Sequence, residues 1–278
     1  MMKGLFHFIL SHSIFISFCA AALGLQTLLL LSQPVNNYLL ACIFFATLSG
    51  YNAYWITSKL SFNRYSSFSS FLRSNRSSLV VLLTAVAGML FCFSHLHLVM
   101  YNIIITFIFL ALYAVPLIPL RQLHFTRKAG FVKTILLALA WTMATILIPL
   151  QIAVTEMPTE AILVFLIRFL FMLMLCIIFD KRDAAIDKIR GLQSLATDIS
   201  AALLNYLMGF IFLVYMLASY ALKFYGITMQ HIAALILTGI CGLLVYIGSF
   251  KKREYIFYYF LVDGLMFLSG LLTLLAGI

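Results

Sequence analysis

The chain is built from long runs of apolar residues, and this pattern limits its fold more than any other feature. Each of nine such runs is close to the roughly 20 residues that a helix needs to cross a bilayer. Inside a bilayer the backbone N–H and C=O groups must bond within the segment itself, which favours helices. The sequence therefore predicts an all-α membrane protein with nine transmembrane helices, at about residues 5–31, 38–58, 77–95, 98–119, 131–151, 161–179, 198–222, 228–249 and 255–277.

The composition excludes an ordinary soluble domain. Apolar residues make up 64% of the chain and charged residues only 9%, whereas about a quarter of the residues in soluble domains are charged. No polar stretch is long enough to form a separate domain, so we expect one transmembrane domain over residues 1–278. Lys3 and the apolar run after it resemble a signal peptide, but the run continues to Leu31. That length predicts a first membrane helix instead.

Basic residues are concentrated in alternate loops. The loops after the second, fourth, sixth and eighth runs, together with Lys3, hold sixteen of the eighteen Lys and Arg residues. Cytoplasmic loops retain Lys and Arg. We therefore expect a cytoplasmic N-terminus, an external C-terminus and a multi-pass location in the cell (inner) membrane. The net charge of +10 then describes one membrane face, which suits anionic lipid and does not indicate nucleic-acid binding.

Acidic residues are scarce, and three of the eight lie in the segment FDKRDAAIDKIRG, residues 179–191. Asp180, Asp183 and Asp187 have i, i+3, i+7 spacing, which places them on one face of a helix. Mg²⁺ prefers oxygen ligands and often bridges carboxylates to substrate phosphates, and the interleaved bases suit the remaining phosphate oxygens. The alternative is a solvated segment whose acids and bases neutralise each other, and spacing alone does not decide between the two.

The wider segment DKRDAAIDKIRGLQSLA resembles the second aspartate-rich motif of the UbiA family of intramembrane prenyltransferases. Asp180, Asp183, Asp187 and Gly191 match that motif in place, and Ser194-Leu195 stands where Thr-Leu is usual. The segment YAVPLIPLRQLHFTRKAGFVKTILLALAW is similar to the region of the family between its fourth and fifth helices. The resemblance implies a nine-helix bundle with a cytoplasmic N-terminus, which binds a prenyl diphosphate through Mg²⁺.

One part of the chain departs from that family. The family has a first motif, N-D-x-x-D-x-x-x-D, at the cytoplasmic end of its second helix, facing the second motif. The corresponding stretch here is GYNAYWITSKLSF. Asn52 is retained, but the aspartate positions are Ala53, Ile56 and Leu60, and Lys59 adds a positive charge. The resemblance therefore implies a site with fewer metal ligands, compensated by bases, or a protein in which catalysis has been lost.

The resemblance assigns roles to individual residues. It implies transfer of a prenyl group from an isoprenoid diphosphate to an aromatic or lipid acceptor in the membrane. Its alternatives are a terpene cyclase and a non-catalytic binder or carrier of a polyprenyl lipid. The candidate catalytic residues are Asp183 and Asn52; the candidate Mg²⁺ ligands are Asp180, Asp183 and Asp187; the candidate diphosphate contacts are Lys59, Tyr113, Arg121, Lys128 and Arg182.

Two further charges lie within apolar runs. Arg168 falls in the sixth run and Asp263 in the ninth, and ionisable residues inside membranes usually pair. The sequence therefore suggests an Arg168–Asp263 pair. The five cysteines have neither metal-site nor redox spacing, which indicates packing residues.

Overall fold

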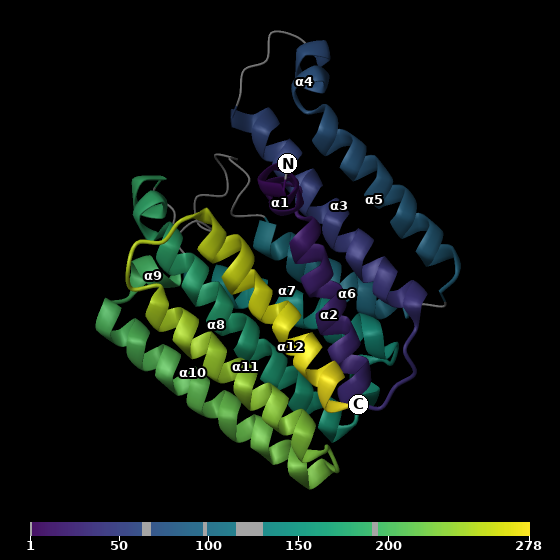
Figure 1. Ribbon diagram of the computed structural model, residues 1–278, viewed down its shortest axis with the longest axis vertical. Coiled ribbons are helices and arrows are strands. Elements are labelled where there is room, and N and C mark those ends of the chain that lie inside the picture. Colours follow the sequence, from purple (N-terminus) through teal and green to yellow (C-terminus); the bar gives the residue numbers. More distant parts are fainter. Residues whose placement is uncertain (1, 63–67, 97–98, 115–129, 191–193) are drawn as a thin grey trace.

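Helices make up all the regular structure in the described part of the computed structural model, which covers residues 2–62, 68–96, 99–114, 130–190 and 194–278 (Figure 1). The α-helices are α1 (Met2–Ser11), α2 (Ile14–Leu30), α3 (Asn37–Phe62), α4 (Phe68–Ser74), α5 (Arg76–Ser94), α6 (Met100–Ala114), α7 (Gly130–Leu150), α8 (Thr159–Arg190), α9 (Leu195–Asp198), α10 (Ala201–Ala221), α11 (Met229–Gly248) and α12 (Asp263–Ala276). Short 3₁₀ turns occupy Val154–Glu156 and Leu222–Tyr225, and a π-helical turn, Phe257–Val262, leads into α12.

The predicted runs correspond to helices in the described part of the chain, but nine membrane crossings are not confirmed there. In the described ranges, seven helices are long and apolar enough to cross a membrane, and the bent pair α1–α2 adds an eighth if it counts as one span. The run predicted at 98–119 contains α6, whose apolar part, Met100–Leu112, is shorter; part of that run lies outside the described residues. A multi-pass helical membrane fold is confirmed, and the ninth crossing stays a prediction.

The first predicted span is broken rather than straight. α1 and α2 meet at an angle of 62°, at Ser13, whose φ of 61° is left-handed. The break frees backbone carbonyls, and a buried side chain from α3 binds one of them. The Asn52 amide donates to the His12 carbonyl at 2.9 Å and to the Leu48 carbonyl at 2.8 Å. Asn52 therefore joins α3 to the bend.

Helix α8 forms the centre of the bundle. Every residue from Leu170 to Ile178 is buried, and a helix that is apolar all round belongs in a core. It contacts α7, α10 and α11. α2 and α12 lie close together at Gly270, where an added Cβ would lie 2.5 Å from the Ala22 carbonyl oxygen. Only a glycine allows this crossing without a shift of backbone.

The suggested Arg168–Asp263 pair is wrong. Arg168 is 3% exposed, and its guanidinium donates to neutral groups. Nη2 lies 2.7 Å from Gln26 Oε1, Nη1 lies 2.9 Å from Thr145 Oγ1, and both lie 3.1 Å from the Leu23 carbonyl. Asp263 interacts electrostatically with Arg182 instead. Arg168 contacts α2 and Asp263 interacts with α8. The sequence alone does not reveal which helix each buried charge meets.

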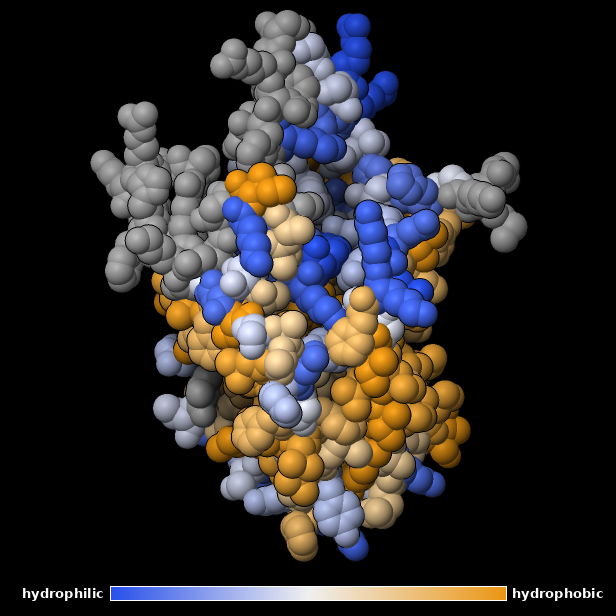
Figure 2. Space-filling view, turned by 90° about the vertical axis from the view of Figure 1, so that its left-hand side faces the viewer, coloured by the Kyte–Doolittle hydropathy of each residue, from blue (hydrophilic) through white to orange (hydrophobic). Residues whose placement is uncertain are grey.

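The surface divides along the long axis of the molecule. Figure 2 shows apolar side chains over the lower part and hydrophilic side chains gathered over the upper part. Figure 1 places α4 at that upper end. An apolar band with a polar end is the pattern expected of a protein set in a bilayer.

Candidate functional site

The carboxylate motif lies on an uninterrupted helix. α8 is mostly apolar as far as Phe179 and continues through the motif to Arg190. The motif was expected in the connection after the sixth apolar run, and the structure makes it part of the helix. At 100° per residue, Asp180 and Asp187 point only about 20° apart and Asp183 about 60° from Asp180. The three carboxylates share a face, as expected from their spacing, but the structure gives each of them a different environment.

Asp180 faces the beginnings of α7 and α9. Its Oδ2 atom accepts a short hydrogen bond from the Thr134 hydroxyl and a second, of 3.3 Å, from the Leu195 N–H. The Lys133 ammonium and the Asp187 carboxylate interact with it electrostatically. One end of the bundle thus brings together two carboxylates, a hydroxyl and a cation from α7 and α8.

Asp183 is joined to the residue beside it. Arg182 donates to both of its carboxylate oxygens, Nε at 2.7 Å and Nη2 at 2.8 Å, which is the strong bidentate geometry. The guanidinium also lies 4.9–5.2 Å from the ring centres of Phe179, Tyr258 and Tyr259. Its Nη1 atom is buried without a hydrogen-bond partner. Arg182 therefore holds Asp183 in an ion pair, with Nη1 buried beside the aromatic rings.

The other base at the start of the motif points elsewhere. Lys181 Nζ lies 3.7 Å from the centre of the Phe250 ring and 3.4 Å from Ser249 Oγ, at the end of α11. Cation–π contact and a hydroxyl bond account for its position. Interleaving of acids and bases in the sequence therefore does not bring all the bases to the carboxylates.

The oxygen donors suit a hard cation in kind, although they do not form a finished cage. Asp187 is 8% exposed, and the carboxylates of Asp180 and Asp187 with the Thr134 hydroxyl are ligands that Mg²⁺ accepts. Among the described residues no three His, Cys, Asp or Glu side chains are grouped to hold a metal. Mg²⁺ often uses only one or two carboxylates and completes its shell with water and substrate phosphate. The residues fit such a partial site.

The degenerate first motif is used for helix packing. The Asn52 amide is bound to two backbone carbonyls, and Ile56 is buried at 7% exposure. Lys59 is exposed, and its Nζ donates to Asn75 Oδ1 at 3.3 Å, across to the start of α5. These contacts turn the predicted catalytic Asn52 and diphosphate contact Lys59 toward α1, α2 and α5.

Three predicted diphosphate contacts cannot be placed in the site, and two residues of the site were not predicted. Arg121, Lys128 and the side chain of Tyr113 lie outside the described residues. Lys133 and Thr134 were missed, although both follow the basic loop in the first turn of a long apolar helix. In a topology of antiparallel spans, the first residues of α7 lie at the same membrane face as the last residues of α8. That relation could have identified Lys133 and Thr134 from the sequence.

The fold is similar to that of one solved protein. The match is a structure described as digeranylgeranylglyceryl phosphate synthase in membranes, with a TM-score of 0.57 and 14% identity, over 100% of this chain and 99% of the other. That neighbour is a UbiA-family intramembrane prenyltransferase. The resemblance drawn from the sequence is therefore confirmed at the level of the fold. No protein-family model and no curated protein matches the chain.

Proposed function

We propose that this protein is a UbiA-like membrane prenyltransferase with nine spans and a cytoplasmic N-terminus. It transfers a prenyl group from an isoprenoid diphosphate to a hydrophobic acceptor, aromatic or lipid, in the cell (inner) membrane. One observation carries the proposal: Asp180 interacts with Thr134, Lys133 and Asp187, in a fold that matches a prenyltransferase over its full length. Carboxylates, a cation and an apolar bundle are what an isoprenoid diphosphate requires.

The chemistry follows from charge. Diphosphate leaves carbon only if its developing negative charge is neutralised, and a Mg²⁺ ion at this site would supply that neutralisation. Asp180 and Asp187 are the proposed anchors of the ion, and Lys133 adds a fixed positive charge beside them. The apolar bundle around α8 keeps water from the allylic cation. The C–O bond to diphosphate breaks, and a new bond forms between the prenyl carbon and the acceptor, which loses a proton.

Asp183 joins this site through an exchange of partners. In the described structure its charge is satisfied by Arg182. A bound diphosphate would attract the positive charge of the Arg182 guanidinium. Movement of Arg182 toward the phosphate would leave Asp183 as a further carboxylate that could hold Mg²⁺. After this exchange Arg182 would contact the diphosphate and Asp183 would be a Mg²⁺ ligand, as expected from the sequence. The ion pair between them would be lost.

The test is metal-dependent binding of geranylgeranyl diphosphate to the purified protein. Asp180→Asn keeps the shape of the side chain but removes the charge, and we expect binding to fall at least about ten-fold, or ~1.4 kcal/mol. Asp198→Asn is the matched control, because Asp198 is an exposed carboxylate in the neighbouring α9. Binding that needs no Mg²⁺ and ignores Asp180→Asn would contradict the proposal.

A second candidate is a binder or carrier of a polyprenyl lipid without catalysis. The packing roles of Asn52 and Lys59 favour it, because the stretch that resembles the family's first motif contains no carboxylates. Incubation of labelled geranylgeranyl diphosphate with native membrane lipid separates the candidates. A transferase releases diphosphate and forms a new labelled lipid, a cyclase forms its product from the donor alone, and a binder returns the donor unchanged.

A further inference from the structure

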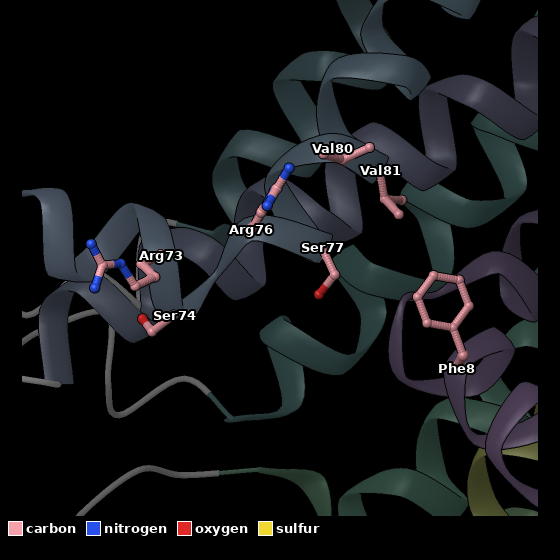
Figure 3. Close-up of a pocket in the computed structure, with 7 residues that line it drawn as sticks. All are labelled: Phe8, Arg73, Ser74, Arg76, Ser77, Val80 and Val81. Carbon is pink, nitrogen blue, oxygen red and sulfur yellow. The ribbon is translucent and has the colours of Figure 1, made fainter.

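A groove of about 520 Å³ lies between α1 and the first turns of α5. Figure 3 shows Phe8 of α1 across from Ser77 and Val81 of α5, with Arg73 at the end of the groove remote from Phe8. Arg76 and Val80 also line the groove. The volume falls within the roughly 300–1,000 Å³ of small-molecule pockets. The groove thus has a ligand's dimensions, with apolar walls at one end and bases at the other.

The bases of the groove have no internal counter-charge. The first acidic residue in the chain is Glu156, so the 155 residues that precede it contain no carboxylate at all. Arg73 and Arg76 are exposed, and within the described part of the chain neither forms an ion pair. Charge complementarity therefore calls for an anion from outside the protein.

The walls of the groove call for an apolar group as well. Phe8 is 39% and Val80 55% exposed, and α5 begins at Arg76 and runs on as an apolar helix. Arg76 therefore marks the membrane surface, where headgroups of anionic lipids meet their acyl chains. A free phosphate would gain nothing from contact with Phe8 and Val80. A phospholipid has a phosphate that suits the arginines and an acyl chain that suits these apolar side chains.

Hydrogen bonds fix the two walls relative to each other. His12 Nε2 lies 3.1 Å from Ser77 Oγ, which links the bend after α1 to α5. The His12 carbonyl in turn accepts from Asn52 of α3. A site built this way needs little reordering to bind, and preorganisation of that kind favours affinity.

We propose that this groove binds an anionic phospholipid of the membrane leaflet. Its phosphate lies at Arg73, Arg76 and the Ser77 hydroxyl, and one acyl chain lies between Phe8 and Val81. The site is separate from the carboxylate site on α8 and does not depend on prenyl transfer.

The experiment measures lipid retention by native mass spectrometry on the full-length protein in micelles that contain phosphatidylglycerol or phosphatidylcholine. We expect the wild type to retain phosphatidylglycerol preferentially. The Arg73→Gln/Arg76→Gln double variant should lower that retention about five-fold for each arginine. The control is Lys251→Gln/Lys252→Gln, which removes two exposed bases from the connection before α12 and should leave retention unchanged. Equal retention of both lipids, or an equal loss in the control, overturns the proposal.

A second variant tests the apolar wall without a change of charge. Val81→Trp fills the groove, so a bound acyl chain is displaced and retention of phosphatidylglycerol should fall. Added inorganic phosphate should displace little of the lipid, because it cannot use the apolar wall. Displacement by inorganic phosphate combined with full retention in Val81→Trp would show a simple anion site and overturn the assignment of a lipid.

Discussion

Removal of Gln26 should destabilise the protein more than removal of the charge that it binds. Gln26 Oε1 is the closest acceptor of the buried Arg168 guanidinium, at 2.7 Å. Gln26→Leu leaves the cation in the membrane interior with the Leu23 carbonyl and the hydroxyls of Thr145 and Thr27. Arg168→Met removes the cation itself and keeps a long apolar side chain in its place.

The magnitudes follow from what each change leaves unpaired. After Arg168→Met, the Leu23 carbonyl still accepts from Thr27 at 3.2 Å, and Gln26 Nε2 keeps its bonds to Ser269 and Thr273. Only Gln26 Oε1 is stranded, at ~1–3 kcal/mol, and loss of the buried charge offsets part of this. Gln26→Leu removes a hydrogen bond to a buried cation, ~1.5–3 kcal/mol, and in addition the Nε2 bonds to Ser269 and Thr273. The double variant Gln26→Leu/Arg168→Met should lose less unfolding free energy than the sum of the two single losses, by ~0.5–3 kcal/mol.

The assay is the free energy of unfolding in micelles, measured for both single variants and the double variant. Arg168→Met combined with Asp263→Asn serves as the control cycle. Because these two residues share no contact, their effects should add within ~0.5 kcal/mol. A larger loss for Arg168→Met than for Gln26→Leu would refute the reasoning, and so would strong coupling between Arg168 and Asp263.

Three further predictions concern packing, topology and charge. Gly270→Ala should destabilise the fold by ~1–3 kcal/mol, because its methyl group meets the backbone of Ala22, whereas Gly209→Ala, with open space around it, should change the unfolding free energy by less than ~0.5 kcal/mol. A reporter fused after Ile278 should be found outside the cytoplasm, and a cytoplasmic reporter would rule out nine spans with an internal N-terminus. Lys133→Gln should weaken binding of geranylgeranyl diphosphate several-fold in a titration with Mg²⁺ present, by ~1 kcal/mol; unchanged affinity would remove Lys133 from the site.

The architecture and the motif could be predicted because both depend on local pattern. Apolar runs of bilayer length must form helices, since lipid offers the backbone no hydrogen bonds. The described helices lie on the predicted runs, except that the first run is divided between α1 and α2 and that α8 continues past the sixth run to Arg190. The spacing of Asp180, Asp183 and Asp187 predicted a shared helical face for the same reason. The bend at Ser13 could not be predicted, because apolar residues continue on both sides of it. A left-handed backbone conformation at one residue does not change the hydropathy of the sequence.

Partners across helices were beyond the reach of the sequence. It shows that Arg168 and Asp263 are both buried charges, but not that Arg168 meets Gln26 from α2 while Asp263 interacts with Arg182. It places Lys133 in a basic loop region, and only the packing of α7 on α8 brings that cation to Asp180.

The sequence by itself determined that this chain crosses a membrane as a bundle of helices and carries its carboxylates on the face of one of them. These properties depend on residues within a few turns of each other and on the solvent around them. The tertiary structure decided that Asp180 faces Thr134, that Arg182 lies over the rings of Tyr258 and Tyr259, and that Asn52 donates to the His12 carbonyl at the bend. Those choices depend on how helices rotate and cross, which side-chain packing sets and no local pattern encodes.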